Sequence, residues 1–354
     1  MKITFCIKGC AIKPIGGHKV LYEYANRLSK RGHDVTIIFP SADNLYQLHL
    51  PVGVRVFICK VLTDAIHVLP PWFKFEKKIK IKTTKDYSEM NFPDADYIIA
   101  TAVETAIPVS ELPKRCGKKI YFIQDYEVWG MQEKDLLKTY SLGMQNIVIS
   151  NWLKDIVEKH SAQKTILVPN AIDTNKFKIF NPIEKRNPLI IGLLYHSGSH
   201  KGLKYAFEAI DIVKKKYPKI HVIIFGATKP NITLSDTFEF HYRASEKEVI
   251  DIYNRCGIFL CATIDEGFGL TGAESMACGC AFVSTDYKGV KEYAINEVNA
   301  LLSPVKNSEK LAYNIQRLVE DNDLRLRIAK QGNLDIQKRS WDNAVDIFEK
   351  SLSL

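Results

Sequence analysis

The sequence predicts an α/β fold made of two Rossmann-like, doubly wound domains, and three observations support this prediction. Short apolar runs alternate with amphipathic stretches twice along the chain, on either side of a pause near residue 170. Such alternation predicts parallel sheets with helices on both faces. The length of 354 residues allows two cores, since single cores stop growing at roughly 250–300 residues. The composition, 46% hydrophobic and 25% charged, is that of a globular protein.

In the first half, strands are predicted at residues 2–7, 34–39, 53–59, 96–101, 119–124 and 145–150. An amphipathic helix is predicted from 18 to 31, because Leu21, Tyr24, Ala25 and Leu28 recur at helical spacing before Gly32. These elements define a domain over residues 1–169.

The pattern pauses around residues 169–173, and the polar segment that contains Pro182 and Pro188 is typical of an interdomain link. A second domain over 170–340 is then predicted. Its strands are expected near 189–194, 220–225, 258–262 and 281–284, and its helices near 201–216, 246–255 and 271–278.

The most informative stretch runs from Asp265 to Glu274, between a buried strand and a helix that Gly279 closes. Gly267 and Gly269 leave the backbone bare, so its N–H groups and the helix start can approach a phosphate. Glu266 and Glu274 would repel that phosphate, so they are expected to accept hydrogen bonds from sugar or ribose hydroxyls. The stretch therefore predicts a nucleotide sugar as ligand. Alternatively, the glycines only shape a turn and Glu274 complements the helix dipole.

Glu-Gly-Phe-Gly-Leu, followed after three residues by Glu and then by Ser-Met-Ala-Cys-Gly, closely resembles the donor site of glycosyltransferase family 4. The resemblance implies the GT-B fold, with two Rossmann-like domains facing a central cleft, and a retaining mechanism. It places donor binding at Glu266, Gly267, Phe268, Gly269, Leu270 and Glu274. It also implies that the first domain binds the acceptor, that the second binds the donor, and that a final helix over about 341–354 packs back on the first domain.

Two further loops match what the resemblance requires. Gly16 and Gly17, before the 18–31 helix, correspond to the family's loop over the donor; alternatively, they form a plain turn that needs no ligand. Lys201 matches a lysine that offsets charge on the leaving diphosphate, or it is a solvated lysine at a helix start. The family's usual arginine is replaced here by His196 or Tyr195, neither of which is a fixed bidentate cation.

Three more residues complete the predicted site. Asp125 follows the strand at 119–124, where relatives have a histidine that touches the donor sugar. It hydrogen-bonds sugar hydroxyls or serves the acceptor, or else it caps the following segment. Tyr242 and Arg243 lie where the family seats the base, and this assignment is positional only.

Charge and cysteine content limit the partners. Residues 1–169 carry a net charge of +7 and residues 170–354 a net charge of +2, which favours an anionic partner for the first half. No recognised nucleic-acid motif accompanies the charge, so nucleic acid is not expected. The eight cysteines lack zinc spacing and are expected to be reduced core residues. No apolar stretch approaches a membrane span and no signal peptide is evident, so a cytoplasmic location is expected.

Residues 72–85 interleave aromatic and aliphatic residues with six lysines and one glutamate. Aromatic rings suit the headgroup boundary and lysines suit an anionic leaflet, so this run predicts peripheral binding to the inner face of a membrane. A solvated face whose apolar residues pack on the domain, or a loop that contacts a soluble anionic acceptor, explains the run as well.

The sequence thus predicts a metal-independent, retaining hexosyltransferase that uses a nucleoside diphosphate sugar and no cofactor, with Glu266, Lys201 and Asp125 as catalytic residues. The expected acceptor is a glycan or a lipid-linked hydroxyl in cell-surface polysaccharide or glycolipid synthesis. A sugar-nucleotide epimerase, a phosphorylase or a non-catalytic sugar-nucleotide-binding subunit is the alternative.

Overall fold

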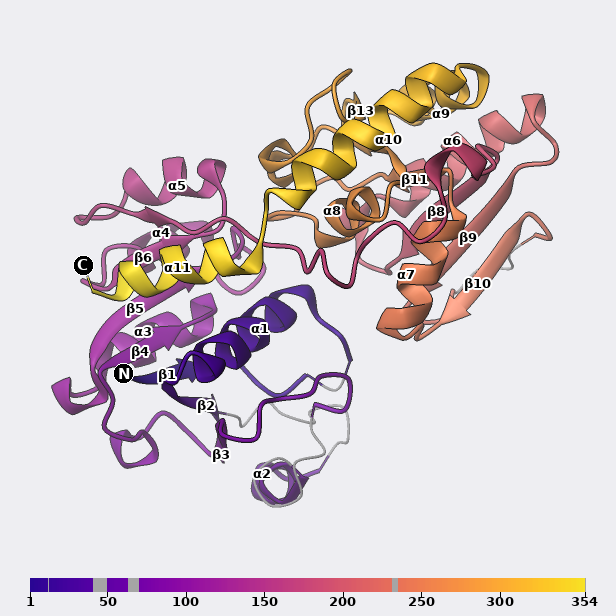
Figure 1. Cartoon of the computed structure of the whole chain (residues 1–354). Coiled ribbons are helices and arrows are strands. Elements are labelled where there is room, and N and C mark those ends of the chain that lie inside the picture. The colour runs from indigo at the N-terminus through magenta and orange to yellow at the C-terminus, as the bar shows by residue number, and fades with distance from the viewer. Residues whose placement is uncertain (12, 41–49, 63–69, 231–234, 354) are drawn as a thin grey trace. The chain divides into compact units, whose positions relative to one another are not determined.

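The computed structural model describes residues 1–11, 13–40, 50–62, 70–230 and 235–353, and the chain divides into two compact units (Figure 1). The first unit contains Met1–Asn170 together with Ala344–Leu354, and the second contains Ala171–Asn343. The sequence predicted these divisions after residues 169 and 340.

The first unit is built on a seven-stranded parallel sheet with the strand order β3-β2-β1-β4-β5-β6-β7. Its strands are β1 (Lys2–Cys6), β2 (Asp34–Pro40), β3 (Lys80–Thr84), β4 (Tyr97–Ala100), β5 (Lys118–Ile123), β6 (Gln145–Val148) and β7 (Ile166–Leu167). The chain starts in the middle of the sheet with β1. This strand pairs with β2 on one side and with β4 on the other. This reversal is the point at which doubly wound sheets bind ligands, at the carboxyl ends of the strands.

The helices of the first unit are α1 (Gly16–Lys30), α2 (Val52–Lys60), α3 (Val103–Glu111), α4 (Glu133–Thr139), α5 (Asn151–Glu158) and most of α11 (Trp341–Leu352). Helix α1 buries Leu21, Tyr24 and Leu28, as the spacing predicted, and Gly32 follows it at a φ of 90°. The helix begins two residues earlier than predicted, so Gly16 and Gly17 lie in its first turn rather than in the preceding loop.

The predicted strand over 53–59 is wrong, because these residues lie in helix α2. Valine and isoleucine dominate the segment and favour strands locally, but Val56 and Cys59 lie three residues apart and both are buried, as on one face of a helix. The strand beside β2 is instead β3, within the lysine-rich run, and this strand was not predicted.

The second unit repeats the plan with a six-stranded parallel sheet of order β10-β9-β8-β11-β12-β13. Its strands are β8 (Ile190–Tyr195), β9 (His221–Gly226), β10 (Phe238–Tyr242), β11 (Ile258–Cys261), β12 (Ala281–Thr285) and β13 (Leu301–Ser303). The four predicted strands are confirmed. The edge strands β10 and β13 were not predicted, since β10 carries polar residues and β13 is short.

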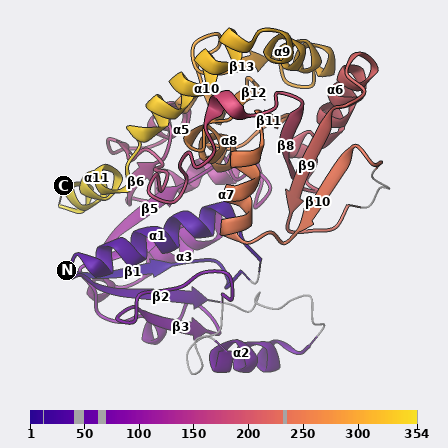
Figure 2. The ribbon, with the colours of Figure 1, turned by 45° about the vertical axis from the view of Figure 1, so that its right-hand side comes forward.

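The helices of the second unit are α6 (Leu203–Lys216), α7 (Glu246–Arg255), α8 (Leu270–Ala277), α9 (Ser308–Glu320) and α10 (Asn322–Gln337). Helices α6 and α9 pack side by side (Figure 2). Ile210, Val213 and Ile315 belong to their shared core, which also contains Leu193 of β8 and Ile224 of β9. The strand order reverses between β8 and β11, so this unit has its own ligand-binding edge.

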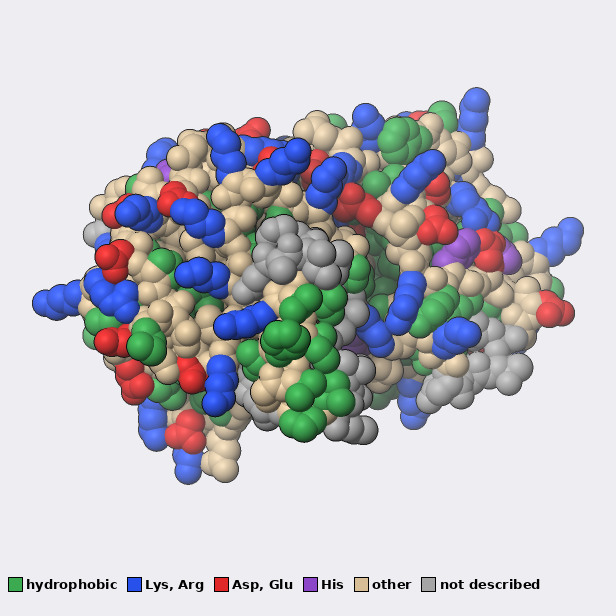
Figure 3. All heavy atoms as spheres, turned by 90° about the horizontal axis from the view of Figure 1, so that it is seen from below, with side chains coloured by type: hydrophobic (Ala, Val, Ile, Leu, Met, Phe, Trp, Pro, Cys, Tyr) green, Lys and Arg blue, Asp and Glu red, His purple; other side chains and the backbone are tan. Residues whose placement is uncertain are grey.

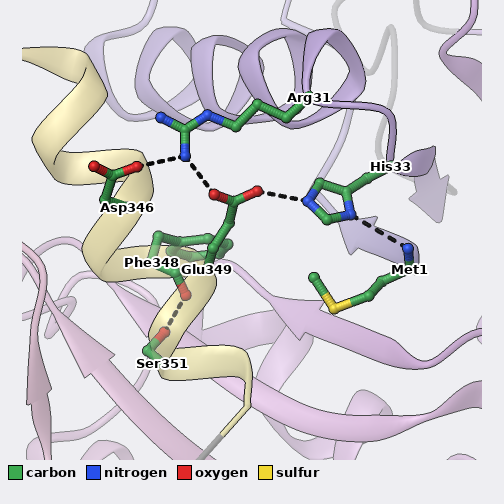
Figure 4. Close-up of polar contacts among 7 residues, drawn as sticks. All are labelled: Met1, Arg31, His33, Asp346, Phe348, Glu349 and Ser351. Carbon is green, nitrogen blue, oxygen red and sulfur yellow. Dashed lines mark hydrogen bonds and ion pairs between the residues drawn. The ribbon is translucent and has the colours of Figure 1, made fainter.

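Helix α11 returns to the first unit at the end of the chain. The ring of Phe348 lies 4.7 Å from Tyr24, 5.7 Å from Phe122 and 6.4 Å from Phe5, measured between centroids. Arg31 pairs with Asp346 at 2.6 Å and also with Glu349 (Figure 4).

His33 extends this ion-pair network. Its Nε2 lies 2.6 Å from Glu349 Oε1, and its Nδ1 lies 3.3 Å from the amino group of Met1 (Figure 4). The ring contacts of Phe348 in the core and the ion-pair network at the edge of that core therefore hold α11 on α1 and β1.

All eight cysteines are buried and none forms a disulfide, so the prediction of reduced core cysteines is confirmed. Burial raises the pKa of several of these thiols, including Cys6 and Cys256, because the thiolate would lose its hydration. These thiols are therefore protonated and unreactive at neutral pH.

Candidate functional site

The loops that follow β8 and β11 leave the sheet of the second unit side by side, where its strand order reverses. The backbone N–H of Ile264 donates to the carbonyl of His200 at 2.7 Å, which ties the loops together. Gly202 has a φ of +61°, and an added Cβ there would lie 2.0 Å from the carbonyl oxygen of Ala262. Only glycine allows the loops to approach this closely.

This approach brings Lys201 and Glu266 together. The Nζ of Lys201 lies 2.5 Å from Oε1 of Glu266, and the two side chains are 16% and 24% exposed. An ammonium has three donors and a carboxylate has two acceptor oxygens. Each member of the pair can therefore bind a further group: Lys201 an anion, and Glu266 a hydroxyl.

His196 lies in the same loop as Lys201. Its Nδ1 accepts a hydrogen bond of 3.0 Å from the backbone N–H of Gly198, so the neutral ring carries its proton on Nε2. Burial and the charge of Lys201 lower the pKa of His196 below its usual value. His196 is thus a neutral N–H donor near pH 7. Tyr195 is buried against Phe240, so of the two residues that could replace the arginine only His196 is accessible.

The loop over 266–270 is held from behind by two buried tyrosines. Tyr293 donates to the carbonyl of Gly269 at 2.9 Å, and Tyr287 donates to the carbonyl of Phe268 at 3.3 Å. Gly269 has a φ of +94° and is the residue before α8; an added Cβ there would lie 1.9 Å from the hydroxyl of Tyr287. The glycine is thus required both by the turn and by the close approach of a tyrosine.

Phe268 is 3% exposed and its ring lies 5.0 Å from that of Tyr293. Its side chain therefore anchors the loop, and only its backbone can serve a ligand. Leu270 begins α8 and is partly exposed. The sequence did not single out Tyr287 and Tyr293, because their role depends on a fold that brings residues from beyond β12 behind the loop.

Glu274 lies on α8 and is 8% exposed, and the hydroxyl of Tyr253 on α7 lies 3.5 Å from its Oε2. Tyr242 and Arg243 lie at the end of β10, at the same carboxyl edge but two strands away from β8. Tyr242 is 42% exposed, and the guanidinium of Arg243 lies 5.0 Å from the centre of its ring. These two residues form an exposed aromatic and cationic surface.

In the first unit, the structure joins the start of α1 to the end of β5. Gln124 donates from Nε2 to the carbonyl of Gly17 at 3.3 Å. Asp125 accepts a hydrogen bond of 2.8 Å from the backbone N–H of Tyr126, so one of its oxygens caps the following segment. Gly16, Gly17 and Asp125 are thus grouped at the carboxyl edge of this unit's sheet.

Glu127, which the sequence analysis did not single out, lies beside Asp125. It accepts a hydrogen bond from the backbone N–H of Val103 at the start of α3. Burial, reinforced by the charges of Glu104 and Asp125, raises the pKa of Glu127 to about 8. Glu127 is therefore protonated near neutral pH and can donate a hydrogen bond. Its position just beyond the carboxyl end of a strand was the only signal in the sequence.

Comparison with known proteins finds glycosyltransferases that resemble this chain. Residues 174–335 match the model of the family described as glycosyl transferases group 1. One curated relative is the N,N'-diacetylbacillosaminyl-diphospho-undecaprenol alpha-1,3-N-acetylgalactosaminyltransferase of Campylobacter jejuni, 27% identical over 175 residues, which are 47% of this chain and 45% of the relative.

A second relative is the poly(glycerol-phosphate) alpha-glucosyltransferase of Bacillus subtilis, 25% identical over 250 residues, which are 64% of this chain and 35% of the relative. The matched regions thus span less than half of both relatives.

Two solved structures cover the whole chain. HepE of Anabaena in complex with UDP aligns with a TM-score of 0.78 and 16% identity, over 100% of both chains. TarM of S. aureus aligns with a TM-score of 0.77 and 11% identity, over 100% of this chain and 99% of that one. At these identities the likeness establishes the fold, which is GT-B in both neighbours and in this chain.

Proposed function

Because residues 174–335 belong to the group 1 glycosyltransferases, we propose that this protein transfers a sugar from a nucleoside diphosphate sugar to an acceptor hydroxyl. The observation that supports this most directly is the Lys201–Glu266 pair, at the point where the strand order of the second sheet reverses. It sets a phosphate-binding cation beside a hydroxyl-binding carboxylate, and a nucleotide sugar needs both.

In the proposed reaction, the bond between the anomeric carbon and the diphosphate oxygen breaks, and the acceptor oxygen bonds to that carbon. The proton of the acceptor hydroxyl passes to the departing diphosphate. Lys201 stabilises the negative charge that builds on that leaving group, which lowers the barrier rather than merely binding substrate. The N–H groups at the start of α8 and the Nε2–H of His196 add neutral donors.

Glu274 and Glu266 are proposed to bind the hydroxyls of the ribose and of the transferred sugar. Tyr242 and Arg243 offer a surface for the base, because an aromatic ring and a guanidinium both stack on a nucleobase. In the first unit, Gly16 and Gly17 are proposed to meet the donor, and Asp125 and Glu127 to hydrogen-bond the acceptor.

The relatives suggest which donor, which acceptor and which stereochemistry to propose for this chain. HepE was solved with UDP and with UDP-glucose, so UDP-sugars of the hexose type are the first donors to test. The two curated relatives act on a polyprenol-linked sugar and on a poly(glycerol phosphate), which favours a lipid-linked or polymeric acceptor in cell-surface synthesis. Both are named as alpha-transferases, and an alpha-linked donor gives an alpha product only when configuration is retained.

The test combines binding with turnover. A thermal-shift screen of nucleoside diphosphate sugars should raise the melting temperature for one donor class, since a ligand that binds only the folded state stabilises it. Glu274→Ala should abolish the shift, whereas Glu266→Ala should mainly reduce turnover. The anomeric configuration of the product, read by NMR, tests retention, and an unchanged rate with EDTA tests metal independence.

A donor shift without turnover on any acceptor would instead favour a non-catalytic sugar-nucleotide-binding subunit. The observation that favours such a binding subunit is the neutral His196, which stands where the family usually has an arginine. No shift with any nucleotide sugar would overturn the proposal.

A further inference from the structure

Helix α2 exposes an apolar stripe. Val54, Phe57 and Val61 are 45%, 68% and 37% exposed, and their spacing of three and four residues places them on one face of the helix and its C-cap. Leu50, which precedes the helix, is 37% exposed. The opposite face packs inward through Val56 and Cys59, which are 7% and 1% exposed. The helix therefore has apolar residues on both faces and covers only one of them.

Single exposed apolar side chains are common on protein surfaces, whereas a contiguous apolar patch marks a binding surface. Figure 3 shows this patch in the region of α2, with basic side chains near it. The helix packs against β3, the edge strand of the first sheet, so the patch lies at an edge of the unit.

Lysines accompany the stripe. Lys60 ends α2, Lys82 lies exposed on β3, and further exposed lysines precede and follow that strand at positions 77, 78 and 85. None of these five lysines forms an ion pair with another described residue; Lys80, by contrast, pairs with Asp34. The charge beside the stripe is thus left for an external anion.

The aromatic residues of the lysine-rich run are not part of this surface. Trp72, Phe73 and Phe75 lie 4.8–5.5 Å from the ring of Tyr22, and the indole of Trp72 donates to the carbonyl of Ala11 at 2.7 Å. These partly exposed rings pack on the first unit, which favours the alternative that the apolar residues of the run pack on the domain. Of the run over 72–85, the exposed lysines at positions 77, 78, 82 and 85 remain available to an anionic surface.

We propose that α2 docks the protein on an anionic lipid bilayer, lying in the plane of the interface with Phe57 among the acyl chains and the five lysines against the headgroups. Interfacial helices pair an apolar face with basic residues in this way, and each lysine near an anionic leaflet strengthens binding. A second copy of the chain fits less well, because two such faces would bring like charges together.

Co-sedimentation with vesicles tests the proposal on the full chain without any sugar donor, so its outcome is independent of the proposed enzymatic function. The wild type should pellet with vesicles of equimolar phosphatidylcholine and phosphatidylglycerol, pellet poorly with phosphatidylcholine alone, and be released by high salt. Phe57→Asp should weaken binding by about tenfold or more, as expected when a phenylalanine can no longer be buried.

Val54→Asp provides a second probe of the stripe. The combined variant Lys77→Glu, Lys78→Glu, Lys82→Glu and Lys85→Glu should lose the preference for the anionic lipid. Phe180→Asp, at a 61% exposed position of the second unit, is the matched control and should bind as the wild type does. Circular dichroism checks that each variant is folded.

Equal, negligible pelleting on both lipids at low salt would overturn the proposal, as would unchanged binding of both stripe variants. Sedimentation velocity adds a separate check. A concentration-dependent dimer that Phe57→Asp abolishes would assign the stripe to a second copy of the chain and would also overturn the proposal.

Discussion

At the scale of single residues, Lys201 offers the sharpest test of the proposed chemistry. If its ammonium stabilises the leaving diphosphate, Lys201→Ala should lower kcat by roughly tenfold to a hundredfold, the cost of losing a charged hydrogen bond of about 1.5–3 kcal/mol. Donor affinity should fall less. Steady-state kinetics and calorimetric donor binding measure the two effects.

Lys204→Ala is the matched control, because Lys204 is 77% exposed and lies in the first turn of α6, at a distance of 3.8 Å from Glu208. It should behave as the wild type does. Unchanged turnover of Lys201→Ala with a raised KM would contradict the role in the transition state.

His196 defines how this chain differs from the usual pattern. The ring of His196 is a neutral donor, so His196→Arg should add a positive charge beside the diphosphate. If the histidine has no role beyond replacing the arginine, this variant should bind the donor more tightly. Donor affinity and kcat of this variant decide the point. Lower kcat with tighter binding would show that the neutral Nε2–H has a task of its own.

Glu127 predicts a pH dependence of stability. Its pKa of about 8 in the folded protein lies above the value of about 4.3 in an unfolded chain, so between these values the folded state binds the extra proton. Stability should therefore fall as pH rises through this window, by up to about 1.4 kcal/mol per pH unit. Glu127→Gln keeps an acceptor for Val103 and should remove this component.

Urea unfolding of wild type and Glu127→Gln at pH 5, 6, 7 and 8 measures the difference. A constant difference across these pH values would mean that Glu127 is ionised in the folded protein. If Glu127 also donates to the acceptor, the variant should keep its activity above pH 8, where the wild type loses it.

The sequence predicts site residues where they belong to a recognisable motif. Glu266, Gly269 and Lys201 stand in recognisable positions, and the structure brings Lys201 and Glu266 into contact. Glu127 could not be predicted, since its raised pKa depends on burial and on Glu104 in the first turn of α3. The fate of Trp72 could not be predicted either, because an aromatic residue beside lysines suits both a core and a membrane.

At the scale of elements, the segment from Tyr287 to Tyr293 acts as a brace for the glycine loop. Tyr293→Phe removes the hydroxyl that donates to the carbonyl of Gly269. The hydrogen bond contributes about 0.5–1.5 kcal/mol, so donor affinity should fall by roughly twofold to tenfold while the fold is kept. Isothermal calorimetry measures the affinity.

Tyr313→Phe is the control for this prediction, because its side chain is 51% exposed on α9. Equal donor affinities in both variants would show that the loop keeps its shape without the brace.

Elements were predicted well where periodicity was strong and poorly at sheet edges. The central strands β1, β4, β8 and β11 are buried apolar runs and were found. The edge strands β3 and β10 carry charged and polar residues, so their pattern resembles a surface loop. Helix α2 was mistaken for a strand because its exposed and buried faces are both apolar, which hides the helical period.

At the scale of the whole molecule, helix α11 completes the core of the first unit. Phe348 is fully buried between Phe5, Tyr24 and Phe122, so Phe348→Ala should destabilise that unit by about 3–5 kcal/mol. Hydrogen exchange followed by mass spectrometry should show faster exchange in β1 and α1. The second unit, which does not contain Phe348, should exchange as before.

Leu334→Ala, at a 58% exposed position on α10, serves as the control and should leave both patterns unchanged. Equal acceleration of exchange in both units would mean that they unfold together.

None of the described helices combines the length and the apolar character needed to cross a bilayer.

The return of α11 also sets an order of events during synthesis. The second unit is a single continuous segment and can close its core once Asn343 has left the ribosome. The first unit is made earlier, yet Phe5, Tyr24 and Phe122 must wait for Phe348, which is translated after the whole of the second unit. The unit whose translation begins first is thus the unit whose core is completed last.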